Sequence, residues 1–312
     1  MCFVSPRRRP LPYTRTPPPP SPNFARTALQ LMRPHQWVKN SFVLFGVLFA
    51  GRWGDWALLG QAGLTFLAFC AVASAIYIGN DLVDVHADRV HPHKRHRPLA
   101  SGLVSTAQAR MLGGLLVGLG CGLAATVSWP VLALAMGYIA INAAYSLRLK
   151  HAPILDVFCI CAGFMLRILA GTVGLGIHPS SWLLLCGLMF TLFLGFAKRR
   201  AELMLMQQHP KRTTRRVLHA YKPEMLEQYL SISATCTVLS YALYTVSPDT
   251  IELHGTDRLI YTVPLIIYGI FRYLLLLHSH GAGQDTARDL LRDRQLLLCV
   301  LAWLALTVGL IR

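Results

Sequence analysis

Residues 57–79 read ALLGQAGLTFLAFCAVASAIYIG, an apolar run without a charged side chain, and residues 80–84 continue it as NDLVD. About 20 mainly apolar residues are enough for a helix to cross a bilayer. A carboxylate at the end of such a run is costly to hold near lipid, and acids in this setting usually have a function. The segment therefore predicts a transmembrane helix that ends in a polar site.

Similar runs fill most of the chain. Hydrophobic residues make up 54% of the 312 residues and charged residues 14%, which is more apolar material than one water-soluble core requires. The runs lie at residues 41–56, 57–79, 107–127, 129–146, 154–176, 182–197, 228–247, 258–278 and 295–311. The first is short and is interrupted by Gly51, Arg52 and Gly54. We therefore expect an all-α integral membrane protein of about nine transmembrane helices, formed by one domain over residues 24–312.

The basic residues favour one orientation in the membrane. The chain has 30 Lys and Arg against 14 Asp and Glu, a net charge of +16 that in a soluble protein would suggest nucleic acid. If the N-terminal tail is cytoplasmic, nearly all basic residues fall in cytoplasmic segments, as the positive-inside rule requires. The exceptions are Arg52, Arg258 and Arg312 on the opposite side and Arg167 and Arg272 inside runs. We therefore expect a multi-pass protein of the plasma (inner) membrane with a cytoplasmic N-terminus and no nucleic-acid partner.

The N-terminal region divides into two parts. Residues 1–23 contain three arginines at 7–9 and four prolines at 17–20 without an apolar pattern, which predicts a disordered cationic tail beside anionic lipid. From Phe24 onward apolar side chains recur at helical spacing and predict an amphipathic helix on the membrane surface. After the second apolar run, Ser105 and Gln108 have the spacing of a capping box and predict the start of a further helix.

The most informative segment is residues 80–102, NDLVDVHADRVHPHKRHRPLASG. Its acids Asp81, Asp84 and Asp88 are spaced i, i+3 and i+7, so on one helix they fall within an arc of roughly 60°. We expect a single helix to carry all three toward one spot before Pro92 ends it. Carboxylates that lie so near to one another repel unless a cation binds between them, and hard oxygen ligands suit Mg²⁺.

Such a metal would in turn hold a phosphate or diphosphate, with Lys94 and Arg97 supplying further positive charge. The alternative is that these residues are solvated loop charges beside a membrane. The position of Asn80 and Asp81 directly after the apolar run, rather than in the middle of the loop, favours a functional site.

The pattern NDxxDxxxD followed by HPxKxxRPxASG resembles the first Asp-rich motif of the UbiA superfamily of intramembrane prenyltransferases. This resemblance implies a bundle of nine transmembrane helices around a central cavity, with caps over a cytoplasmic mouth. It extends from about Arg33 to the last apolar run.

Further segments resemble one branch of that superfamily, the decaprenyl-phosphate phosphoribosyltransferases. They are RPHQWVKN at 33–40, YSLRLK at 145–150, GFMLR at 163–167, FAKRRAE at 196–202 and YGIFRY at 268–273. Enzymes of this branch attach 5-phosphoribose from phosphoribosyl diphosphate to a polyprenyl phosphate and release diphosphate. Prenyltransferases that use aromatic acceptors usually carry a second DxxxD, whereas in this chain Asp156 is followed four residues on by Ile160.

The resemblance implies a Mg²⁺ ion held by Asn80, Asp81, Asp84 and Asp88, with the three aspartates as the catalytic residues. The substrate-binding residues that it implies are Arg33, Lys39, Asn40, Asn80, Lys94, Arg97, Tyr145, Lys150, Asp156, Arg167, Lys198 and Arg199. Arg33 and Lys39 would hold the lipid phosphate, and some of Lys150, Arg167, Lys198 and Arg199 the 5-phosphate of the sugar.

Several of these residues have a structural interpretation as well. Asp156 and Arg167 share a helical stripe, so they either pair with each other or bind phosphate or ribose. Lys150, Lys198 and Arg199 could equally be positive-inside anchors. Arg272, inside a run, is less easily explained in that way.

The sequence thus predicts a Mg²⁺-dependent transfer of 5-phosphoribose to polyprenyl phosphate at a membrane surface, with the lipid tail in the bilayer. One alternative is transfer of a prenyl group from its diphosphate to an aromatic acceptor, although the missing second DxxxD argues against it. A transporter or lipid-binding scaffold is the alternative outside enzymes. Whether the chain forms a homo-oligomer is left open.

Overall fold

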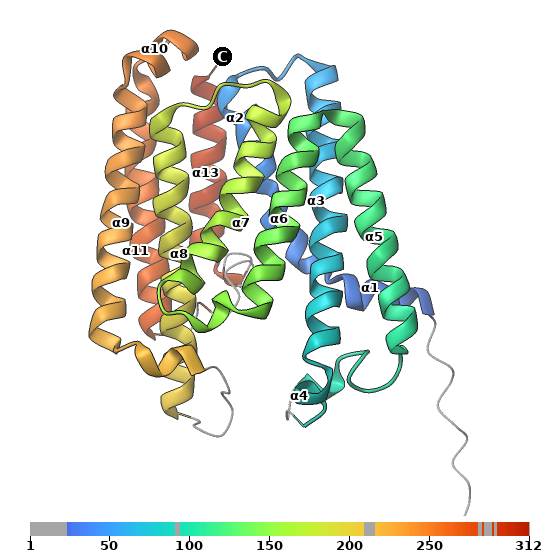
Figure 1. Cartoon of the computed structure of the whole chain (residues 1–312). Helices are drawn as coiled ribbons and strands as arrows, with labels where there is room; N and C mark the ends of the chain where they lie inside the picture. Colours follow the sequence, from blue (N-terminus) through green and yellow to red (C-terminus); the bar gives the residue numbers. More distant parts are fainter. Residues whose placement is uncertain are drawn as a thin grey trace, which may run out of the picture.

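The computed structural model describes residues 24–90, 94–208, 216–279, 283, 289 and 292–311. These residues are helical with connecting turns, and no β-strand occurs among them, which confirms the all-α prediction (Figure 1). The predicted cationic tail, residues 1–23, lies outside the described residues.

The apolar runs form the helices of a membrane bundle. Seven helices of the described part are long and apolar enough to cross a bilayer, which confirms an integral membrane protein. They are α3 (Trp56–Val83), α5 (Thr106–Val127), α6 (Trp129–Leu147), α7 (Leu155–Gly171) extended to Leu175 by η4 (Val173–Leu175), α8 (Ser181–Gln208), α9 (Pro223–Val246), and η7 (Arg258–Thr262) together with α11 (Val263–Ser279). The helix α13 (Arg294–Leu310) is apolar but shorter, so the predicted count of nine is not confirmed.

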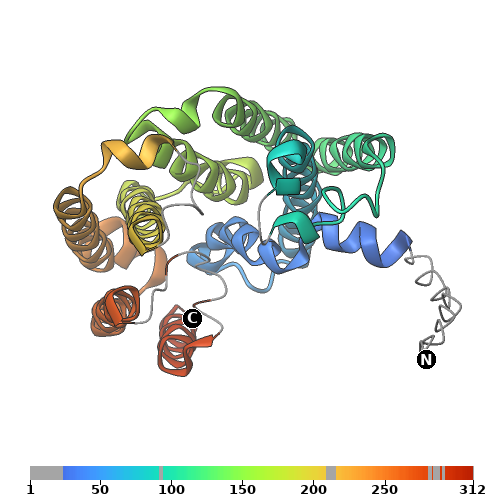
Figure 2. The ribbon, with the colours of Figure 1, turned by 90° about the horizontal axis from the view of Figure 1, so that it is seen from below.

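The first apolar run is irregular. Its first residues, 41–44, end the 3₁₀ helix η1 (Pro34–Leu44), and the run continues as the short helix α2 (Phe45–Ala50). Viewed along the bundle, both lie inside a curve formed by the longer helices (Figure 2). Backbones meet closely there, because a Cβ added at Gly171 of α7 would lie 1.7 Å from the carbonyl oxygen of Val43. A Cβ at Gly46 would lie 1.8 Å from the carbonyl oxygen of Gly171, so these glycines let η1 and α2 pack against α7.

Short helices complete one end of the bundle. The predicted surface helix is α1 (Phe24–Met32), which buries Thr27 and Leu31 and packs against α3. The predicted capping box is confirmed at the start of α5, where Ser105 and Gln108 bond to each other's backbone N–H. At one end of the bundle α3 and α6 terminate and α7 begins, and we call this the charged end. It carries the short helices α4 (Val85–Val90), η2 (Lys94–His96), η3 (Leu149–His151) and η6 (Arg216–Ala220) (Figure 1). The helix α10 (Pro248–His254) and the short η4 (Val173–Leu175) lie toward the opposite end.

The close contact of η1 with α7 leads to a stability prediction. Gly171→Ala should lower the free energy of unfolding by about 1 to 3 kcal/mol, because the new methyl group has to displace backbone rather than a side chain. Thermal unfolding of the detergent-solubilised protein measures the change. The control is Gly118→Ala on α5, whose added methyl group meets no described atom within 4 Å. Equal melting temperatures of the two variants would contradict the packing.

Candidate active site

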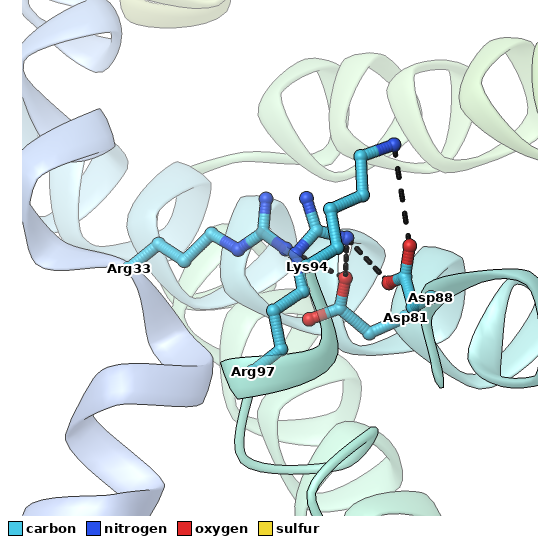
Figure 3. A network of polar contacts seen from close by, with 5 residues as sticks. All are labelled: Arg33, Asp81, Asp88, Lys94 and Arg97. Atoms are coloured by element: carbon cyan, nitrogen blue, oxygen red, sulfur yellow. Dashed lines mark hydrogen bonds and ion pairs between the residues drawn. The ribbon is translucent and has the colours of Figure 1, made fainter. Parts of the chain in front are cut away.

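Two buried aspartates form the centre of the charged end. Asp81, in the last turn of α3, is 4% exposed, and Asp88, in α4, is 3% exposed. Arg97 lies between them, with Nη1 at 3.0 Å from Oδ1 of Asp81 and 2.6 Å from Oδ2 of Asp88 (Figure 3). Arg33 adds a second guanidinium at 2.6 Å from Asp81, and the Lys94 ammonium lies 4.0 Å from Asp88. Carboxylates at this depth are costly unless paired, and three cations supply that pairing.

The local backbone differs from the predicted single helix. The helix α3 ends at Val83, Asp84 has φ −91° and ψ 5° at its C-cap, and α4 begins at Val85. The prediction of one continuous helix through all three aspartates is therefore wrong. The bend lets Asp81 and Asp88 reach the same guanidinium, whereas Asp84 is half-buried at the break and outside this ion-pair cluster. Among the described residues no group of three or more acids, histidines or cysteines is assembled as a metal site.

Asn80 connects the acid cluster to α6. Its Oδ1 accepts a hydrogen bond from the hydroxyl of Ser146 at 2.6 Å. Ser146 lies in the last turn of α6, directly after Tyr145. The end of α6 is therefore fixed to α3 next to the buried aspartates.

A second buried network lies at the same end of the bundle. Arg199 of α8 and Asp156 of α7 are both fully buried, with 2.5 Å between Arg199 Nε and Asp156 Oδ2. Arg199 Nη1 lies 2.5 Å from Glu202, and its Nη2 donates to the Tyr145 hydroxyl at 3.2 Å. The alternative in which Asp156 pairs with Arg167 is therefore wrong. Arg199 is also more than a surface anchor, because acids and a phenol occupy all three of its nitrogens.

Tyr221 completes this network from the segment between η6 and α9. Its hydroxyl donates to Asp156 Oδ1 at 2.7 Å and accepts from the backbone N–H of Ile154 at 2.6 Å. Burial, and then the hydrogen bond to Asp156, raise the pKa of Tyr221 well above its ordinary value, so the hydroxyl stays protonated and continues to donate. No sequence pattern pointed to Tyr221, because tyrosines are common in membrane proteins and its partners are remote along the chain.

Among the described residues, the hydrogen-bond partners of Arg167 are neutral. Its Nε donates to Asn40, its Nη1 to the carbonyl oxygen of Gly163 and its Nη2 to the Tyr138 hydroxyl, each at 2.7 Å. The guanidinium also lies 4.4 Å from the centre of the Tyr138 ring. No described carboxylate forms an ion pair with it, although it is only 5% exposed. A buried cation of this kind can accept an anionic ligand, which fits its predicted role.

The remaining predicted cations have different surroundings. Lys150 of η3 is half-buried, and its ammonium group forms no hydrogen bond or ion pair with a described residue. Lys198 is half-buried on α8 beside Arg199. Arg272 forms a bidentate pair with Asp293, at 3.1 and 2.6 Å, so its position inside a run has a structural explanation.

A large apolar cavity of about 700 Å³ lies between the helices, lined by aromatic and aliphatic side chains. Its walls include Phe42, Phe45, Phe164, Phe190, Tyr241 and Trp303. Lys39 also lines it, two turns along η1 from Arg33. Arg33, directly before η1, is thus the cation at the acid cluster, and Lys39, within η1, is the cation at the cavity.

The fold and the site together define a class, a helical membrane protein with paired acids and cations at one end and an apolar cavity between its helices. The chain belongs to the UbiA prenyltransferase family, whose model matches residues 40–292. It is 36% identical to the decaprenyl-phosphate phosphoribosyltransferase of Corynebacterium glutamicum, with 91% of this chain and 86% of the relative covered. The enzyme of that name from Mycolicibacterium smegmatis is also 36% identical, with 93% of each chain covered.

Solved structures support the same fold. A UbiA homologue from Archaeoglobus fulgidus bound to GPP and Mg²⁺ superposes with a TM-score of 0.67 at 21% identity, covering 91% of this chain and 97% of that one. The apo UbiA homologue from Aeropyrum pernix gives a TM-score of 0.56 at 15% identity, covering 92% and 96%.

The buried pair of Asp156 and Arg199 leads to a second stability prediction. Asp156→Asn should lower the free energy of unfolding by about 3 to 5 kcal/mol, because it leaves Arg199 buried with one fewer negative partner. Chemical denaturation in detergent measures the loss. The matched control is Asp55→Asn, in a more exposed pair with Arg52, which should change the same quantity far less, because its amide oxygen can still accept the N-cap hydrogen bond from the Leu58 N–H. Similar losses in both variants would show that the buried pair contributes no more than a surface pair.

Proposed function

We propose that this protein transfers 5-phosphoribose from phosphoribosyl diphosphate to a polyprenyl phosphate and releases diphosphate. The observation that carries the proposal is that Arg33, directly before η1, pairs with the acid cluster, while Lys39, within η1, lines the apolar cavity. A phosphorylated sugar donor needs the charged site at the acid cluster, and a lipid chain needs the apolar cavity. The phosphoribosyltransferases at 36% identity support this choice within the family.

The residues at the charged end fit a Mg²⁺ ion. Hard carboxylate and amide oxygens are the ligands that this ion prefers, and we assign Asn80, Asp81, Asp84 and Asp88 to it. In the structure three cationic side chains compensate the two buried aspartates, and a bound ion would take over that compensation from them. When bound, the ion would neutralise negative charge on the departing diphosphate. The A. fulgidus homologue with bound Mg²⁺ supports a metal in this fold.

The arginines have a second role in this proposal. Arg33 and Arg97 are the partners of the aspartates in the structure, and guanidinium groups bind phosphate oxygens in a bidentate manner. Once a metal compensates the carboxylates, Arg33, Lys94 and Arg97 can bind the diphosphate. They then stabilise the charge that develops as it leaves.

The reaction itself requires little proton transfer. The bond between ribose C1 and the diphosphate oxygen breaks, and the electron pair leaves with the diphosphate. A phosphate oxygen of the lipid, already anionic at neutral pH, forms the new bond to C1. No general base is needed, which agrees with a site that is rich in cations.

The other substrate groups are assigned by charge and burial. We place the lipid chain in the apolar cavity and its phosphate near Lys39 and Asn40. Lys150, Arg167 and Lys198 are the candidates for the 5-phosphate. Arg199 is a weaker candidate, because Asp156 and Glu202 already compensate its charge. Asp156 and Tyr145 then act by holding Arg199 rather than by touching the sugar.

We further propose that the charged end faces the cytoplasm of a plasma membrane. The distribution of Lys and Arg supports this orientation, and a charged sugar donor would be available on that side. Residues 24–312 would form the single membrane domain of the chain.

The test of this function is diphosphate release by the purified protein with Mg²⁺, phosphoribosyl diphosphate and polyprenyl phosphate. We expect release with the wild type and a loss of kcat/KM of at least about 100-fold in Asp81→Asn and Asp88→Asn, which remove charge without volume. The control is Asp249→Asn, an exposed acid at the opposite end. In sealed vesicles, only those with the cytoplasmic face outward should respond to added donor.

If the protein consumes a prenyl diphosphate together with an aromatic acid and does not use phosphoribosyl diphosphate, then its activity is prenyl transfer to an aromatic acceptor instead. Full activity of both aspartate variants at saturating Mg²⁺ would contradict the site.

A further inference from the structure

The loop between α6 and α7 carries a cation that has no polar partner in the described part of the chain. It spans residues 148–154 and contains η3 with Lys150, whose ammonium group has no hydrogen bond or ion pair to any residue that the structure describes. The side chain is half-buried at the charged end, so its position depends on how the loop is held. Two contacts fix the loop, one at each end.

The C-terminal end of the loop, at Ile154, has an unusual backbone conformation. Ile154 has φ 66° and ψ −50°, and the N–H of Leu155 donates to the carbonyl oxygen of Pro153 at 2.7 Å. These values define a γ-turn with a positive φ, a rare and strained conformation, and a β-branched residue is poorly suited to it. Something outside the loop must therefore stabilise the turn.

Tyr221 supplies that stabilisation. It is 5% exposed, and its hydroxyl oxygen accepts the Ile154 N–H at 2.6 Å, at the centre of the γ-turn. The same hydroxyl donates to Asp156 at 2.7 Å, in the first turn of α7. One hydroxyl group therefore fixes both the turn and the helix that follows it.

The N-terminal end of the loop is fixed by the same hydrogen-bond network that contains Tyr221 and Asp156. Asp156 pairs with Arg199, and Arg199 donates to the hydroxyl of Tyr145 in the last turn of α6. The helix η3 also packs against η6, the helix that precedes Tyr221. The loop with Lys150 is therefore held at both ends by one network, in which Asp156, Arg199 and Tyr221 are buried.

We propose that Tyr221 is a positioning residue for the sugar donor, because its hydroxyl holds the loop so that Lys150 binds a phosphate of phosphoribosyl diphosphate. The proposal rests on the function proposed above. Tyr221 acts through Ile154 and Asp156 and touches no substrate. Its effect is therefore specific to the donor and leaves lipid binding, which depends on η1 and the cavity, unchanged.

The variant Tyr221→Phe removes only the hydroxyl. We expect KM for phosphoribosyl diphosphate to rise on the order of 10-fold, with KM for the lipid and kcat within about twofold of the wild type. The matched control is Tyr229→Phe, since Tyr229 is a half-buried tyrosine of α9 whose hydroxyl forms no hydrogen bond to a described residue. It should behave as the wild type. An unchanged KM for the donor in Tyr221→Phe would overturn the positioning role.

A double-mutant cycle with Lys150→Met separates positioning from a general loss of order. If Tyr221 acts through Lys150, adding Tyr221→Phe to Lys150→Met should raise KM for the donor by less than about twofold further. If the rise in the donor KM of the double variant equals the product of the two single rises, the proposal is overturned.

Ile154→Gly provides a rescue, because glycine adopts a positive φ without strain. In the double variant with Tyr221→Phe, KM for the donor should return to within about threefold of the wild type. If Tyr221→Phe alone does not fold, the test is made on this double variant. A KM for the donor that remains raised about 10-fold in the double variant would overturn the proposal. A wild type that ignores phosphoribosyl diphosphate would instead refute the proposed function, and the positioning role with it.

Discussion

A carboxylate that is removed from water needs positive charge beside it, and this requirement organises the charged end of the molecule. Asp81 and Asp88 are nearly inaccessible, and Arg97 binds both at once. Because Arg97 follows η2 and Asp88 belongs to α4, this ion pair also holds α4 against the residues next to η2 (Figure 3). A further guanidinium, from Arg33, connects the start of η1 to the same aspartate.

The same requirement recurs at Asp156, where Arg199 is the compensating cation. The end of α6 joins the two clusters, since Ser146 donates to Asn80 and the neighbouring Tyr145 accepts from Arg199. The two clusters are therefore attached to consecutive residues of one helical turn. The acids that we propose for a metal and the loop that carries Lys150 are thus parts of one connected polar layer, with the apolar cavity beside η1.

Much of this arrangement could be predicted from local sequence. Hydropathy predicted the helices, and the spacing of Ser105 and Gln108 predicted the start of α5, because both signals depend on neighbours along the chain. The partners of Asp156 could not be predicted, because Arg199 and Tyr221 come together only when α7, α8 and η6 pack. Arg167, although on the same helical stripe as Asp156, lies 11 residues away, or roughly 16 Å along the axis, too far for a pair.

The central claim is that Arg97 compensates Asp81 and Asp88 until a divalent cation takes its place, and binding of Mn²⁺ as a paramagnetic substitute for Mg²⁺ tests it most directly. Electron paramagnetic resonance of the purified protein without substrate measures the affinity. Arg97→Gln should bind Mn²⁺ about tenfold more tightly than the wild type, because the competing cation is gone, whereas Asp81→Asn should lose the site. Weaker binding in Arg97→Gln, or unchanged binding in Asp81→Asn, would contradict the account.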